Sequence, residues 1–383
     1  MHLVVAIPTY NRLQYLKRAI NSFCSQLIPD GVRLTLLVSN TASTDGTFNY
    51  LKKQQIAQSN LVICNQSLEW VGGNYGGILE TLPGDADWIW FMGDDDEFSS
   101  NKSISKVCNL LLQNHKNKNL ALIHACDEKR TKKTGEVVLD TTFNLCKRFG
   151  YLEMLGWFTS LIIRKSEFVS SIQQIHQRVL VTRGQAAVNT PYSAFVHSSY
   201  FLQNLHEKDA AFYDEALVRE QKEVDKGATQ TRWQSENMGE RYLFVVDDFY
   251  RLLDQGLRLT DLPTSFFKYH KYHLWDRFLI YQIDAVTEVV GTKNPDLIKS
   301  YQQRHKNNWA RIEHLAQMLA NPEIQKWLVI NARNIKAQCT SLFSKPNDAP
   351  VMKMLQETRK YLTLGCYDYN INFSKTKIFK DKT

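Results

Sequence analysis

Trp88-Ile89-Trp90-Phe91-Met92-Gly93-Asp94-Asp95-Asp96-Glu97 is the stretch of sequence that constrains the fold most. Its bulky apolar residues are typical of a buried strand, and they run directly into four consecutive acids. Crowded carboxylates repel one another more strongly as they lose water, and a bound cation relieves this repulsion. Hard divalent ions such as Mg²⁺ and Mn²⁺ prefer oxygen ligands. The stretch therefore predicts a buried strand that ends at a metal site, with a solvated acidic turn as the alternative.

Short apolar runs alternate with helix-like stretches through the first 125 residues. Besides the run at 88–92, we expect strands at residues 3–7, 34–39, 61–64 and 120–124. Helices are expected at 12–25 and 47–58, and the turn Ser43-Thr44-Asp45-Gly46 can cap the second of them. This order is the βαβ pattern of a mostly parallel sheet with flanking helices, a Rossmann-like α/β fold. Ligands bind such sheets at the carboxyl ends of the strands.

The pattern changes along the remainder of the chain. A strand-like run at 159–164, a helix from about residue 166 and a helix begun by Pro191 continue the α/β part, and after residue 236 the sequence becomes largely helical. We expect an α/β domain over residues 1–235, with a ligand-binding half at 1–125 and a second half at 126–235. A helical, basic C-terminal region is expected over 236–383.

Composition limits the partners and the location. Residues 1–110 carry 8 Lys and Arg against 10 Asp and Glu, whereas the remainder carries 39 against 29. The basic excess suggests an anionic partner, which could be a phospholipid surface, a diphosphate-bearing acceptor or nucleic acid. The seven cysteines include no CxxC pair and are expected as reduced thiols. Because we find no signal peptide and no apolar run of 18 residues, we expect a cytoplasmic protein without a transmembrane helix.

Three further motifs precede the acidic stretch. They are Ala6-Ile7-Pro8-Thr9-Tyr10-Asn11-Arg12, Val38-Ser39-Asn40-Thr41-Ala42-Ser43-Thr44-Asp45-Gly46-Thr47 and Val71-Gly72-Gly73-Asn74-Tyr75-Gly76-Gly77. In order and spacing, residues 1–100 resemble the donor-binding half of family 2 inverting glycosyltransferases, which have a GT-A fold. The Gly-Asp-Asp-Asp variant is similar to that of bacterial enzymes that add sugars to O-antigen, capsule or other lipid-linked glycans. Beyond residue 165 the resemblance is thin.

The resemblance implies transfer of a sugar, with inversion, from a nucleotide-sugar donor to a hydroxyl of a saccharide or lipid-linked glycan. It implies Mn²⁺ or Mg²⁺ as cofactor, with Asp95 as the first ligand and Asp96 and Asp94 next. The donor contacts that it implies are Pro8, Thr9, Tyr10, Arg12, Asn40, Gly73, Asp94 and Asp95. The alternative for Tyr10 and Arg12 is that they merely cover the edge of the sheet.

Two positions depart from the family pattern. Asn40-Thr41 stands where the family usually has Asp-Asn, so an amide replaces the carboxylate that commonly accepts the uracil N3 proton. An amide can accept that proton or donate to a cytosine N3. We therefore expect a UDP-sugar first, with CDP, dTDP or GDP also possible. Gly93 stands in the place of the first Asp of the usual DxD motif.

The catalytic base has the weakest signal. The family supplies it from a Glu-Asp pair after a segment that resembles residues 159–168, but no Asp or Glu lies between 168 and 206 here. His197 is the best placed titratable group in that window, although a lone helix histidine is more often structural. Asp209, Asp127 and Glu153 are its rivals, and Asp96 is counted as catalytic beside its role as a ligand.

Two other classes of protein are alternatives. A parallel sheet with glycines after a strand could serve an NAD-type oxidoreductase, but Pro8-Thr9-Tyr10-Asn11 stands where GxGxxG should follow the first strand. A nucleic-acid-binding protein would fit the basic C-terminal half, but the acidic cluster would repel a polyanion. We therefore expect no nucleic acid partner.

Membrane association is the prediction that follows from the C-terminal residues. Aromatic and basic residues mix at 266–275, and residues 331–383 carry 10 Lys and Arg against 4 Asp and Glu. We expect peripheral binding at the cytoplasmic face of the inner membrane, where an undecaprenyl-diphosphate-linked acceptor would lie; an ordinary helical domain is the alternative, and the oligomeric state is not indicated. Co-sedimentation with anionic vesicles should weaken as salt rises from about 0.05 to 0.5 M. Binding unchanged by deletion of residues 331–383 would contradict the role of this tail.

Overall fold

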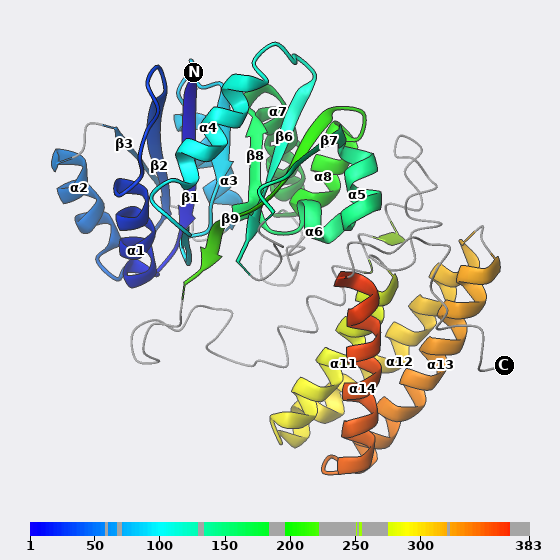
Figure 1. Ribbon diagram of the computed structural model, residues 1–383. Coiled ribbons are helices and arrows are strands. Elements are labelled where there is room, and N and C mark those ends of the chain that lie inside the picture. Colours follow the sequence, from blue (N-terminus) through cyan, green and yellow to red (C-terminus); the bar gives the residue numbers. More distant parts are fainter. Residues whose placement is uncertain are drawn as a thin grey trace. The chain divides into compact units, whose positions relative to one another are not determined.

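The computed structural model describes residues 1–57, 60–66, 71–128, 134–183, 196–221, 250, 253–254, 275–319 and 322–367 (Figure 1). The chain forms two compact units: residues 1–146, 153–190 and 196–232 make the first, and residues 147–152, 191–195 and 233–383 make the second. The boundary expected at 235–236 lies outside the described residues and stays a prediction, as does a helix start at Pro191. Most of the stretch at 266–275 and the end of the basic tail, 368–383, also lie outside them.

A nine-stranded sheet forms the centre of the first unit, in the order β3-β2-β1-β4-β8-β6-β9-β5, with β7 paired to β9. The strands are β1 (His2–Thr9), β2 (Arg33–Thr41), β3 (Leu61–Gln66), β4 (Trp88–Phe91), β5 (Asp96–Phe98), β6 (Leu120–Asp127), β7 (Val137–Thr141), β8 (Leu161–Arg164) and β9 (Asp209–Glu220). All five strands expected in the first 125 residues lie in this one sheet, as does the strand-like run near 159–164. The predicted α/β fold is therefore confirmed.

The sheet is mixed, and its longest parallel run is in its first half. Strands β3, β2, β1 and β4 are parallel, β8 lies antiparallel between β4 and β6, and β6 is parallel to β9. Apolar periodicity predicts that a strand exists, but its direction depends on the partner that it meets. Two antiparallel steps across β8 restore the direction of β4 in β6. The carboxyl ends of β1, β2, β3, β4, β6 and β9 therefore lie at one edge of the sheet.

Eight described helices accompany this sheet. They are α1 (Leu13–Cys24), α2 (Thr47–Ala57), α3 (Val71–Thr81), α4 (Ser103–Gln113), α5 (Thr142–Phe149), α6 (Tyr151–Leu155), α7 (Lys165–Arg183) and α8 (Val196–Leu205). The apolar face of α1 is buried in the core, together with alternate residues of the strands. The glycines of 71–77 lie in α3. Glycine disfavours helices, but burial of Tyr75 and Ile78 overrides that preference here.

Asp45 joins the loops that follow β1 and β2. One carboxylate oxygen accepts hydrogen bonds from the Thr47 backbone N–H (3.1 Å) and hydroxyl (2.6 Å) at the start of α2, as expected for a cap. The other oxygen accepts from the Leu13 N–H (2.8 Å) at the start of α1. Asn11, at a φ of 52°, adds a bond from the Thr44 N–H to its side-chain oxygen (2.7 Å). The two loops are therefore held together at the carboxyl edge of the sheet.

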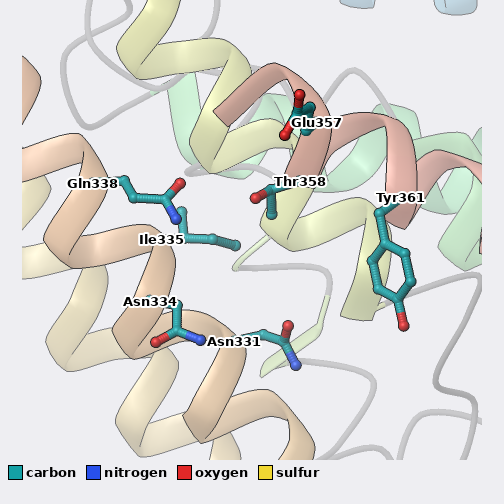
Figure 2. Close-up of a pocket in the computed structure, with 7 residues that line it drawn as sticks. All are labelled: Asn331, Asn334, Ile335, Gln338, Glu357, Thr358 and Tyr361. Atoms are coloured by element: carbon teal, nitrogen blue, oxygen red, sulfur yellow. The ribbon is translucent and has the colours of Figure 1, made fainter. Parts of the chain in front are cut away.

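The described part of the second unit is mainly helical, as expected. It contains α11 (Asp276–Gly291), α12 (Pro295–Gln317), α13 (Pro322–Ser344) and α14 (Ala349–Tyr367). A cavity of about 300 Å³ lies between α13 and α14. Figure 2 shows the amides of Asn331 and Gln338 extending from α13 toward α14, with Thr358 opposite them. Among the described helices, none is both long and apolar enough to cross a membrane.

Candidate active site

The acidic residues follow β4, whose four residues are all buried. Gly93 to Asp96 form a turn in which the Asp96 N–H donates to the Gly93 carbonyl at 3.3 Å. Asp96 then begins β5, which pairs antiparallel with β9 through Asp96 and Glu220. The turn therefore places three carboxylates at the carboxyl edge of the sheet, beside the ends of β1 and β2.

Arg12 and Thr9 hold Asp94 from the loop after β1. The Arg12 guanidinium lies 3.0 Å from Asp94 Oδ1 through Nη1 and 2.5 Å from Asp95 Oδ2 through Nη2. The Thr9 hydroxyl donates to Asp94 Oδ2 at 2.8 Å. Asp94 is buried, and each of its oxygens has a partner in the protein, Arg12 or Thr9. Arg12, which the resemblance implies as a donor contact, pairs here with the carboxylates of Asp94 and Asp95.

Asp96 has a different partner, Thr159, which lies in a short 3-10 helix (Phe158–Ser160) before β8. The Thr159 hydroxyl donates to Asp96 Oδ2 and accepts from the Gly93 N–H at 2.9 Å. The Thr159 carbonyl accepts from the Trp90 indole N–H at 2.9 Å. Thr159, which is distant from Asp96 in sequence but precedes the strand beside β4, therefore orients Asp96 against the end of β4.

Burial shifts the protonation of this cluster. It raises the pKa of Asp94 to about 7, against the opposing effect of the Arg12 charge. Burial, and then the charge of Asp95, raise the pKa of Asp96 well above its usual value. The side chain of Asp95 is 44% exposed. A cation that entered the cluster would favour the charged carboxylates, since it offsets both the lost solvation and the mutual repulsion.

The fit of a metal ion differs among the three acids. Within the described ranges, no three or more His, Cys, Asp or Glu side chains are arranged to hold a metal by themselves. Asp94, expected as a third ligand, is already bound at both oxygens by Arg12 and Thr9. Asp95 Oδ1 and Asp96 Oδ2 instead converge in front of Gly93, at 2.9 and 2.6 Å from where a Cβ would lie. Because Mg²⁺ often takes only one or two carboxylates and completes its shell with phosphates and water, these two residues fit a metal shared with a diphosphate.

Asn40 lies at the end of β2 and is 1% exposed. Its side-chain NH₂ donates to Asn65 Oδ1 on β3 at 2.6 Å, and its own Oδ1 is buried without a hydrogen-bond partner among the described residues. In this arrangement the unpaired group of Asn40 is an acceptor.

The other expected donor contacts are spread along the same loops. Pro8 lies in β1, where it pairs in register with Ser39 of β2. Tyr10 follows the end of β1, and its side chain is half buried. Gly73 lies in the first turn of α3. Tyr10 therefore shares the loop that carries Arg12, Pro8 belongs to the strand before that loop, and Gly73 belongs to a helix.

Two expected bases do not fit their proposed role. Asp209 begins β9, at the opposite end from Glu220 and hence roughly 30 Å along the strand from the acidic turn, where Asn117 and Asn119 donate to it at 2.9 and 3.0 Å. The structure therefore places Asp209 away from the acidic turn, and spacing in sequence does not tell which end of a strand lies beside that turn. His197 is 1% exposed, its ring stacks on Phe158 at 3.7 Å, and burial lowers its pKa to about 3. That environment is typical of a structural histidine.

The remaining candidates are carboxylates. Asp127 ends β6 at the same edge as the acidic turn, and its partner on β9, Val218, lies two residues from Glu220, the partner of Asp96. Glu153 lies in α6 and is 2% exposed. Of the four expected bases, Asp127 is placed best by the topology of the sheet.

Comparison with known proteins gives this geometry a family. Residues 4–166 match the family described as "Glycosyl transferase family 2", and this segment holds β1 to β4, the acidic turn, Thr159 and β8. These residues form a family 2 glycosyltransferase domain. The predicted resemblance to family 2 glycosyltransferases is therefore confirmed over these residues.

Two curated relatives match parts of the chain. An uncharacterized glycosyltransferase of Mycoplasma genitalium is 31% identical over 109 residues, which are 27% of this chain and 35% of the relative. The abequosyltransferase RfbV of Salmonella typhimurium is 27% identical over 131 residues, which are 34% of this chain and 37% of the relative. This chain therefore spans little more than a third of the length of the relatives that it matches.

A solved structure supports the fold of the glycosyltransferase domain. S. aureus TarS 1–349, crystallised in complex with UDP-GlcNAc, matches with a TM-score of 0.53 at 13% identity, and the match covers 94% of this chain and 92% of that chain. At this level of identity the likeness shows the GT-A-like fold alone. Thr159 is a residue of the cluster that sequence reasoning missed, since the neighbouring position of β8 and β4 brings it to Asp96.

Gly93 gives a direct test of this geometry. A Cβ at Gly93 would lie 2.6 Å from Asp96 Oδ2, so Gly93→Ala must displace a carboxylate that Thr159 holds. We expect nucleotide affinity in the presence of Mn²⁺ to fall by about tenfold or more, as when a metal site loses its orientation. Gly84→Ala is the control, since no atom lies within 4 Å of a Cβ there. Calorimetric titration that gives equal affinities for the two variants would contradict this role.

Proposed function

We propose that this chain transfers a sugar from a nucleotide-sugar donor to a hydroxyl of a saccharide or lipid-linked glycan, with inversion. The observation that carries the proposal is the convergence of Thr9, Arg12 and the three aspartates at the carboxyl edge of a family 2 glycosyltransferase domain. Ligands of open α/β sheets bind at this edge. The name of one relative, an abequosyltransferase, supports sugar transfer as the class of reaction.

The proposed roles follow from the positions of the charges. Asp95 and Asp96 would hold Mn²⁺ or Mg²⁺, and the chemistry that such a metal would supply is neutralisation of charge on the leaving nucleoside diphosphate. Arg12 has a planar guanidinium that suits phosphate oxygens as well as carboxylates. Arg12 pairs with Asp95, which is half exposed, so this ion pair lies where the site meets solvent. Asp94 orients Arg12 in this scheme.

The test of this function combines a nucleotide panel with one substitution. UDP, GDP, CDP and dTDP with Mn²⁺ should raise the melting temperature, whereas NAD(P) and oligonucleotides should not. Asp95→Asn should lower transfer by roughly 10²-fold or more, because a neutral amide cannot balance the metal. Mass spectrometry of nucleotide-sugar hydrolysis identifies the donor sugar. Full activity after EDTA treatment would refute the metal role, and no stabilisation by any nucleoside diphosphate would refute the function.

Asn40 is proposed to read the base. Since its NH₂ group is bound to Asn65, its Oδ1 is left to accept a proton, which suits the N3–H of uracil or thymine better than the N3 acceptor of cytosine. We therefore place UDP first, ahead of CDP.

The expected result is UDP affinity at least about tenfold above CDP affinity, the scale on which an unpaired buried acceptor disfavours a ligand. Asn40→Asp should keep or raise the preference for uracil. Asn65→Ala removes the partner of the amide, so the Asn40 side chain can turn and the UDP-to-CDP ratio should fall. An unchanged ratio in both variants, measured by calorimetry, would place the base elsewhere.

Asp127 is proposed as the catalytic base, in place of His197. Inverting transfer needs a group that takes the acceptor proton as the hydroxyl attacks the anomeric carbon. Asp127→Asn should lower turnover by about 10²-fold or more with little effect on nucleotide affinity. His197→Ala should instead lower the melting temperature, because it removes a ring stacked on Phe158. Loss of turnover in His197→Ala at an unchanged melting temperature, with normal turnover in Asp127→Asn, would reverse this assignment; Glu153→Gln in parallel covers the third candidate.

The acceptor is proposed to be a glycan on a lipid diphosphate, reached by peripheral association with the cytoplasmic face of the membrane. The basic excess of residues 331–383 supports this placement. The vesicle experiment given above separates this acceptor from a soluble saccharide.

A further inference from the structure

Gln221 makes an unusual set of contacts with the acidic turn. It directly follows β9, and its backbone N–H donates to the Asp95 carbonyl at 2.9 Å. Its side-chain NH₂ group donates to the carbonyls of Asp94 at 3.2 Å and Asp96 at 3.0 Å. All three consecutive aspartates therefore give their backbone carbonyls to one residue that is more than 120 positions away in sequence.

A fourth carbonyl links Gln221 to the helix that begins beside Arg12. The same NH₂ group lies 3.1 Å from the Tyr15 carbonyl in α1. The Arg12 guanidinium lies over the Tyr15 ring, 4.9 Å from its centroid, and it binds the carboxylates of Asp94 and Asp95 in front. Gln221 therefore contacts the backbone of the three aspartates and of Tyr15, whose ring lies against the Arg12 guanidinium.

The chemistry of this pocket requires a donor at the position of the Gln221 NH₂. Three carbonyl oxygens surround it, so a carbonyl or carboxylate oxygen there would be repelled. The Gln221 Oε1 is buried and has no hydrogen-bond partner among the described residues. A buried acceptor without a partner costs free energy, which the contacts of the NH₂ group offset.

We propose that Gln221 is a positioning residue that clamps the Asp94–Asp96 turn to α1 and thereby sets the spacing of Arg12 and the carboxylates. This inference rests on the proposed function only for its effect on the donor. The clamp itself is a property of the fold. Without the side chain, the turn keeps the backbone bond to Asp95 but loses the tie to its two neighbours and to Tyr15.

The test compares two glutamines of the same unit. Gln221→Met keeps the length of the side chain and removes its polar atoms. Gln26→Met is the matched control, because Gln26 also donates through Nε2 to two backbone carbonyls, those of Ser22 (3.0 Å) and Ser100 (2.8 Å), and contributes nothing to the acidic turn. Gln221→Asn, which keeps an amide one methylene shorter, serves if Gln221→Met fails to fold.

Two measurements are made on the full chain. Hydrogen exchange of peptides covering residues 93–97 should accelerate about tenfold or more in Gln221→Met and stay unchanged in Gln26→Met, since protection follows local opening. The dissociation constants of Mn²⁺ and of UDP with Mn²⁺ should rise about 10- to 100-fold in Gln221→Met only, the usual cost of losing a residue that orients metal ligands. Gln221→Asn should give the same effects at reduced size.

The outcomes separate the clamp from the proposed function. Equal exchange and equal affinities in Gln221→Met and the wild type, or equal changes in Gln221→Met and Gln26→Met, would overturn the clamp. If the wild type binds no nucleoside diphosphate, the proposed function fails, while faster exchange at 93–97 confined to the Gln221 variants still supports the clamp.

Discussion

The rest of the site depends on the repulsion among three consecutive carboxylates at the end of a buried strand. Burial makes their charged forms costly, and it raises the pKa of Asp94 and Asp96. The protein offsets part of this cost with one guanidinium from the loop after β1 and with two threonine hydroxyls. The cluster that results holds its acids in fixed directions.

The sheet provides the rigid support for that cluster. Because β8 returns antiparallel between β4 and β6, it brings Thr159 beside the end of β4. The pairing of β5 with the end of β9 brings Gln221 behind the turn. Asp45 fixes the two preceding loops against each other. The acids are therefore supported by separate parts of the chain, which are the loops after β1 and β2, the residue Thr159 before β8, and the end of β9.

The location of the acids followed from the sequence, but the division of labour among them did not. An apolar run that ends in acids predicts a buried strand with carboxylates at its end, and the motif order gave the family before residue 100. That Asp94 pairs with Arg12, while Asp95 and Asp96 converge in front of Gly93, depends on side-chain directions that no spacing specifies. The position of the candidate bases could not be predicted for the same reason, since Asp209 lies at the opposite end of its strand from the acidic turn.

Local patterns determine local structure in this protein. The sequence by itself determined the α/β class, the strands of the first 125 residues, the Asp45 cap and the acidic end of β4, because each depends on neighbours within a few positions. The tertiary structure decided the antiparallel insertion of β8, the helical state of the glycines at 72–77, and the contacts of Thr159 and Gln221 with the acidic turn. These features depend on contacts between residues about 60 to 130 positions apart, which arise only when strands from distant segments pair in one sheet.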